Sequence, residues 1–250
     1  GNRDRCISRR LQFVQIDEFY PINSSQHNSF YDYVMNYYIK NLGLDKSKAL
    51  LINCDEIRLS GGKHFSEVFP DYHVDLSLRY RECRSSVEQM QRDSIFLIDQ
   101  WCSDYEQKIR DKGGIGFFLG GLGPDGHIAF NTRGSDLYST TRLTQTNFET
   151  QAVAATDLGG IEVSSNRLTI TIGLETITYN PEAVAIIFVA GESKAQIVKD
   201  SIESDMVNVY PATVLQRLKH SKFYLTAGAA SRLTQCMDSY YTTGEWTQEK

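Results

Sequence analysis

The sequence predicts an α/β protein: a mostly parallel sheet with helices on both faces. Short apolar runs of strand type alternate along the chain with longer segments whose apolar residues recur at helical spacing. The chain has 250 residues, 41% of them hydrophobic, which is enough to bury a full core. No repeat and no Pro/Ser-rich linker interrupts it. We therefore expect one domain over residues 1–250.

The first half of the chain predicts three strands, two helices and one irregular segment. The strands are expected at residues 11–16, 49–52 and 115–119. The helices are expected at residues 30–42, where Gly43 ends the pattern, and at residues 87–109. Residues 58–84 are polar and show no firm period, and they contain a Gly-Gly pair and Pro70. We interpret this segment as a long loop or insertion near a site.

The second half repeats the strand-then-helix order. Strands are expected at residues 167–172, 183–190 and 222–226, and helices at residues 192–202 and 228–233. The continuous apolar run 183–190 is typical of a strand buried on both faces. Strands connected by helices in this way predict parallel pairing.

Composition and charge exclude several classes of function. The formal net charge of −5, without a basic run, argues against a nucleic-acid partner. The longest apolar run, residues 183–190, is far shorter than the ~20 residues of a membrane-spanning helix, and no signal peptide is recognisable. Five widely spaced cysteines without a Cys-x-x-Cys pair suggest neither a disulfide framework nor a zinc site. We expect a cytoplasmic protein.

The most informative segment follows the predicted strand 115–119. Residues 121–130 read Gly-Leu-Gly-Pro-Asp-Gly-His-Ile-Ala-Phe, which places Gly121, Gly123, Asp125 and His127 where a parallel sheet opens to ligands. Asp125 can orient the His127 imidazole and raise its basicity. Of five histidines, only this one lies in a glycine-flanked loop after a strand, so we favour a catalytic role over a structural one. Asp-x-His without a third ligand is weak evidence for a metal, and none is predicted.

Three further positions carry charge near predicted strand ends. Asp17, paired with Glu18 after the strand 11–16, is either a general base or an ordinary cap or solvated turn. Lys194 follows Gly191 at a strand-to-helix junction, where a lysine either binds phosphate or is simply solvated. Arg142, together with Arg133, is a candidate anion contact or surface charge.

Residues 120–131 resemble the signature of the glucosamine-6-phosphate deaminase (isomerase) family. The segments 16–19, 139–142 and 191–194 resemble that family's acidic motif, arginine segment and lysine turn, in the same order. The resemblance runs from about residue 11 to 233 except for residues 58–84 and implies a Rossmann-like fold of the sugar-phosphate isomerase type. The related 6-phosphogluconolactonases share Gly-Pro-Asp-Gly-His, but the continuation Ile-Ala-Phe-Asn favours the deaminase branch.

The resemblance implies conversion of glucosamine 6-phosphate to fructose 6-phosphate and ammonia. Asp17 would move a proton from C2 to C1, and His127, oriented by Asp125, would assist ring opening. Lys194 and Arg142 would bind the phosphate, with Gly121 and Gly123 beside the substrate. The family needs no cofactor for this acid–base chemistry. A small sugar phosphate is therefore the expected ligand, and a homo-oligomer the expected assembly.

Three departures from the family pattern keep other functions open. Thr132 stands where these deaminases have a glutamate, and Thr156 aligns with a phosphate-binding arginine. The family's first strand and phosphate loop have no counterpart before residue 11, so we expect an N-terminally truncated chain or part of a longer multidomain protein. The alternatives are a 6-phosphogluconolactonase-like hydrolase and a non-catalytic sugar-phosphate-binding domain.

Overall fold

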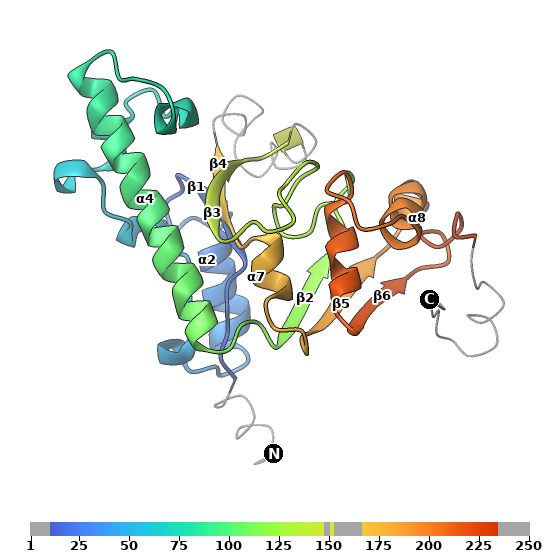
Figure 1. The fold of residues 1–250 in the computed structure, drawn as a ribbon. Coiled ribbons are helices and arrows are strands. Elements are labelled where there is room, and N and C mark those ends of the chain that lie inside the picture. Colours follow the sequence, from blue (N-terminus) through green and yellow to red (C-terminus); the bar gives the residue numbers. More distant parts are fainter. Residues whose placement is uncertain (1–10, 148–150, 153–166, 235–250) are drawn as a thin grey trace.

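The computed structural model describes residues 11–147, 151–152 and 167–234 and contains two three-stranded sheets (Figure 1). The strands are β1 (Asp17–Tyr20), β2 (Phe117–Gly121), β3 (Arg142–Gln145), β4 (Leu168–Thr171), β5 (Val184–Val189) and β6 (His220–Leu225). The main helices are α2 (Phe30–Tyr33), continued by the π-helix η1 (Val34–Lys40), then α4 (Ser86–Asp111), α7 (Leu174–Thr178) and α8 (Ala195–Glu203). Shorter segments are η2 (Lys46–Lys48), η3 (Cys54–Glu56), η4 (Ser60–Gly62), α3 (Phe65–Val68), η5 (Leu76–Arg79), η6 (Glu192–Lys194) and η7 (Pro211–Arg217).

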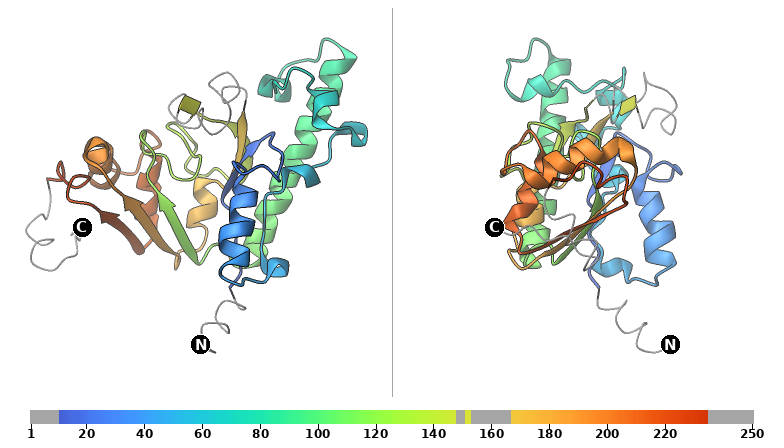
Figure 2. Two further views of the ribbon diagram at one scale, coloured as in Figure 1. Left: turned by 180° about the vertical axis from the view of Figure 1, so that it is seen from behind. Right: turned by 90° about the vertical axis from the view of Figure 1, so that its right-hand side faces the viewer.

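One sheet has the order β2-β5-β6 and is parallel throughout, as the strand-then-helix order predicted. One of its faces is fully buried through Phe118, Ala185 and Ile187. The opposite face exposes Phe117 and Phe188 together with Leu119 and Tyr224, and no described helix crosses it (Figure 2, left). Helices were predicted on both faces of the sheet. Among the described residues, helices cover only one face of the parallel sheet.

The second sheet, of order β1-β4-β3, is antiparallel throughout, which the sequence pattern did not predict. Every residue of its central strand β4 is buried. The predicted strands 11–16 and 49–52 reduce to a single bridge between Val14 and Leu50. β1 pairs with β4 in antiparallel register from Asp17 to Tyr20. The prediction that Asp17 follows a strand was thus wrong, since Asp17 opens β1.

Helix α4 lies between β1 and β2 in the chain, and the segment 58–84 packs against it. Ser85 caps it by accepting a hydrogen bond from the Glu88 amide, and apolar residues at helical spacing line its buried side. The segment 58–84 is not an irregular loop: η4, α3 and η5 fold against the first half of α4 (Figure 1). Phe69 and Leu78 from this segment are completely buried and belong to the same hydrophobic cluster as both sheets.

The remaining predicted elements agree with the structure except at the C-terminal side. The helix over residues 30–42 is present as α2 and η1, and Gly43 ends it with a positive φ of 62°. The predicted helix 228–233 is a series of turns, in which the Ser231 amide donates to the Gly228 carbonyl and the Leu233 amide to the Ala230 carbonyl. No helix in the described part of the chain is long and apolar enough to cross a membrane.

Candidate functional site

The glycine-rich loop after β2 folds tightly around His127. The His127 carbonyl accepts a hydrogen bond from the Gly123 amide (2.9 Å), and Gly126 turns the chain with a φ of +84°. A Cβ added at Gly123 would lie 2.0 Å from the His127 ring. The imidazole therefore rests on the bare Cα of Gly123, which explains why glycine is required there.

Asp125 and His127 form a close, largely buried couple. His127 Nδ1 lies 2.5 Å from Asp125 Oδ1, and the two side chains are only 14% and 11% exposed. Burial opposes ionisation of Asp125, but the hydrogen bond from His127 and the adjacent charge outweigh it and lower its pKa to about 2. An ionised Asp125 holds the proton on Nδ1, which leaves Nε2 free to exchange protons with a ligand.

The second oxygen of Asp125 is held by residues that the sequence analysis did not identify. Asn147 Nδ2 donates to Asp125 Oδ2 at 2.6 Å, and the Arg133 amide donates to the same oxygen at 3.2 Å. Asn147 lies 22 residues from Asp125 and reaches it because β3 ends beside the loop. No local sequence signal connects the two positions.

Asp17 lies in one cross-strand row with Thr171 and Arg142. Thr171 of β4 pairs with Asp17 on one side and with Arg142 on the other, so the three side chains share a face of the antiparallel sheet. The Thr171 hydroxyl also accepts a hydrogen bond from the Phe130 amide, at the end of the glycine-rich loop (3.1 Å). This contact brings the loop of one sheet onto the row of the other.

The acidic pair divides into two different roles. Burial, with a contribution from the adjacent Glu18 carboxylate, raises the pKa of Asp17 to about 7. Glu18 points to the other side of the strand and accepts hydrogen bonds from the Ser29 hydroxyl and the Phe30 and Tyr31 amides. Glu18 therefore caps α2, whereas Asp17 keeps the protonation equilibrium that a general base needs near neutral pH.

Lys194 lies against the glycine-rich loop, as its place after β5 suggested. It is part of η6, which leads directly into α8, and its ammonium group donates a hydrogen bond to the Leu122 carbonyl. Burial lowers the pKa of Lys194. The lysine thus brings a positive charge to the same loop that carries Asp125 and His127.

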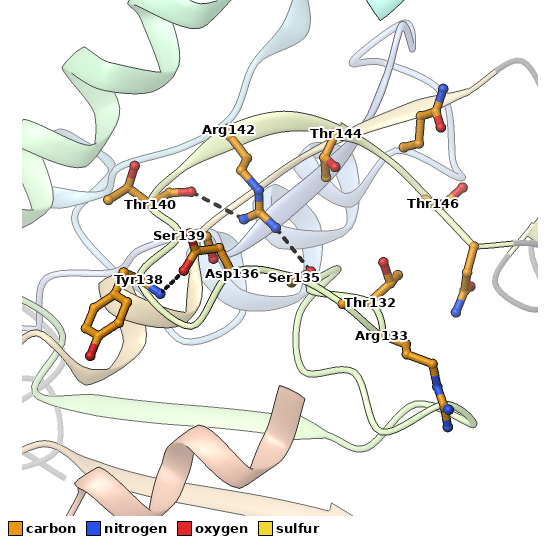
Figure 3. A pocket seen from close by; sticks show the side chains of 13 residues that line it. Thr132, Arg133, Ser135, Asp136, Tyr138, Ser139, Thr140, Arg142, Thr144 and Thr146 are labelled. Atoms are coloured by element: carbon orange, nitrogen blue, oxygen red, sulfur yellow. Dashed lines mark hydrogen bonds between the residues drawn. The ribbon is translucent and has the colours of Figure 1, made fainter. Parts of the chain in front are cut away.

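Arg142 lies at the wall of an open cavity of about 670 Å³ (Figure 3). Its guanidinium donates to Asn131 Oδ1 (2.8 Å), to the Ser135 hydroxyl (3.3 Å) and to the Thr140 carbonyl (3.3 Å). The cavity is lined by residues 132–136, 138–140, 142 and 144–147, which supply hydroxyl, amide and guanidinium groups and the carboxylate of Asp136. Such a lining suits a polar molecule.

Of the two threonines that depart from the family pattern, Thr132 and Thr156, the structure describes only Thr132. Thr132 lines the cavity and offers a hydroxyl where a carboxylate was expected. Thr156 lies outside the described residues. Within the described part of the chain, no group of three or more His, Cys, Asp and Glu side chains is arranged to hold a metal ion.

Comparison with curated proteins identifies relatives of this chain. The glucosamine-6-phosphate deaminase of Mycolicibacterium smegmatis is 41% identical over 143 residues, which cover 57% of this chain and 53% of that protein. That of Caenorhabditis elegans is 34% identical over 132 residues, 53% of this chain and 49% of the relative. The resemblance predicted from the glycine-rich loop is confirmed. The chain spans about half the length of the curated relatives it matches, and no protein-family model matches it.

Solved structures show the same fold at lower identity. A monomeric glucosamine-6-phosphate deaminase of the NagB superfamily gives a TM-score of 0.65 at 20% identity, covering 90% of this chain and 76% of the other. The 6-phosphogluconolactonase of Leishmania guyanensis gives 0.60 at 14% identity, covering 93% and 79%. These likenesses confirm the α/β fold class and do not by themselves separate the two activities.

Proposed function

We propose that this protein is a glucosamine-6-phosphate deaminase that converts glucosamine 6-phosphate and water to fructose 6-phosphate and ammonia. The observation that carries the proposal is a carboxyl group with a pKa of about 7, Asp17, in the cross-strand row that receives the Asp125–His127 loop. An isomerisation requires a base that removes a carbon-bound proton and an acid–base pair at the ring oxygen, and this site provides both.

Each site residue has a role in the proposed reaction. His127 Nε2 exchanges a proton with the sugar during ring opening, and ionised Asp17 takes the C2 proton and returns it to C1. The resulting imine at C2 adds water, the C–N bond breaks and ammonia leaves. Lys194 and Arg142 supply positive charge for the phosphate, which is the favourable partner of a guanidinium or ammonium group.

The test is ammonia release from glucosamine 6-phosphate by the purified protein, with Asp17→Asn as the diagnostic variant. We expect turnover by the unaltered protein and none above background by the variant. Asp104→Asn is a matched control, because Asp104 is exposed on α4, accepts a hydrogen bond from Gln100 and does not line the cavity. Absence of turnover by the unaltered protein would reject the proposal.

The same assay separates the two alternatives. A lactonase would hydrolyse 6-phosphogluconolactone with His127 as the base for water, and Asp17→Asn would then leave the rate unchanged. A non-catalytic binding domain would be stabilised against heat by the sugar phosphate without turning it over.

We also propose a reducing compartment such as the cytoplasm for this protein, since Cys54, Cys83 and Cys102 are all free thiols.

A further inference from the structure

We propose that Asn147 is a positioning residue that completes the Asp125–His127 couple, an inference that rests on the proposed function. The couple is held from two sides. His127 occupies Asp125 Oδ1, and Asn147 is the side-chain donor to Oδ2, at 2.6 Å. His127, Asp125 and Asn147 thus form a hydrogen-bonded triad whose third member is an amide.

The amide is presented by a rigid support. Asn147 lies two residues beyond β3, which pairs along its whole length with the buried strand β4. The Leu143 carbonyl of β3 also accepts a hydrogen bond from Arg79, which is itself paired with Asp99. The short distance along the chain from a fixed strand limits how far Asn147 can move away from Asp125.

The contact with Asn147 restricts how the Asp125 carboxylate can rotate. Without the amide, the described donors to this carboxylate are His127 and the Arg133 backbone, at 3.2 Å. Fewer hydrogen bonds then fix the carboxylate relative to the imidazole, and the proton on Nδ1 is held less firmly. Loss of such a supporting hydrogen bond lowers the fraction of enzyme with Nε2 ready to accept a proton.

Asn147 also bears on the substitution at Thr132. Both residues line the same cavity, and the threonine hydroxyl brings no charge to it. Among the described residues, the side-chain hydrogen bonds that orient His127 run through Asp125 and its amide partner. Removing Asn147 should reduce kcat more than it changes KM, because the contact acts on the proton transfer and not on substrate charge.

The experiment compares Asn147→Ala, the similarly sized Asn147→Leu and the control Gln107→Ala, which removes an exposed amide of α4 that donates to the carboxylate of Asp111. We expect kcat for ammonia release to fall about tenfold in both Asn147 variants with KM within about twofold, and no change for Gln107→Ala. Nitrogen-15 NMR of His127 should show the Nδ1–H tautomer in the unaltered protein and a mixture in Asn147→Ala.

The two readouts keep the inference separate from the proposed function. An unaltered protein that releases no ammonia contradicts the deaminase proposal, whereas the His127 tautomer still tests Asn147. If Asn147→Ala and Asn147→Leu leave the tautomer and kcat unchanged, Asn147 does not position the couple. Should Asn147→Ala fail to fold, the similarly sized Asn147→Leu, which also loses the donor, decides the question.

Discussion

The two sheets of this protein contribute to the site in different ways. The antiparallel sheet is buried throughout its central strand and fixes Asp17 and Arg142 in one row. The parallel sheet is buried on one face, where Ile187 is 0% exposed, and open on the other, where Phe188 is 56% exposed. It carries the glycine-rich loop and Lys194 at the ends of its strands. The proposed site therefore combines a base and an arginine held in the antiparallel sheet with a histidine and a lysine that follow strands of the parallel sheet.

The largest expected effect follows from removing one group of each sheet. Asp17→Asn and His127→Gln should each lower the rate of ammonia release by about 10²–10⁴-fold, the usual contribution of a positioned acid or base. Steady-state kinetics with glucosamine 6-phosphate measures this. If only the His127 variant loses activity, the antiparallel sheet provides structure and no base.

The free energy of unfolding should fall more for a substitution in the antiparallel sheet than for one on the open face of the parallel sheet. Ile170→Ala, at a fully buried position of β4, should lower the free energy of unfolding by about 2–5 kcal/mol because it leaves a cavity. Leu119→Ala, on the open face of β2, should change it by less than about 0.5 kcal/mol. Urea denaturation of both variants tests this difference. Equal losses would show that the face bearing Leu119 is covered in solution.

The charge of Lys194, which lies against the glycine-rich loop, should affect substrate binding more than the catalytic rate. Lys194→Met keeps the apolar stem but removes the ammonium group, so KM for the sugar phosphate should rise about 10–100-fold, as expected for one charge-assisted hydrogen bond. Lys199→Met, one turn further along α8, is the matched control. A fall in kcat at unchanged KM would contradict a phosphate-binding role for Lys194.

The pH dependence should report on Asp17 from the antiparallel sheet. Its pKa is raised from 3.8 to about 7, and a base must be ionised, so kcat should rise with pH up to about 7 and then level off. The same shift stabilises the folded state below pH 3.8, and that contribution is lost as pH rises to about 7. Asp17→Asn should therefore flatten the dependence of unfolding free energy on pH over this range. An unchanged profile in the variant would mean that another group titrates.

The smallest effect is expected at the contact that joins the two sheets. Thr171→Val keeps the shape of the side chain but leaves the Phe130 amide without its acceptor, at a cost of about 1–3 kcal/mol. Ammonia release should fall only a few-fold, because the loop has further anchors such as the Asn131 contacts with Arg142 and the Ile172 carbonyl. Calorimetry and kinetics on the same sample measure both effects. A loss as large as that of Asp17→Asn would make Thr171 part of the chemistry.

The sequence by itself determined the local elements and the identity of the loop. The apolar period of α4, the run that forms β5 and the spacing of Gly123, Asp125 and His127 are local patterns, and local sterics and burial are sufficient to specify them. The homology to glucosamine-6-phosphate deaminases could also be predicted from residues 120–131, because that motif is specific.

Only the tertiary structure decided which distant groups meet. The antiparallel row of Asp17, Thr171 and Arg142 depends on a register between strands about 150 residues apart in the chain, which no local period encodes. The contact of Asn147 with Asp125 likewise depends on where β3 ends. The pKa of Asp17 is a property of its burial, which chain packing creates and a residue pattern does not.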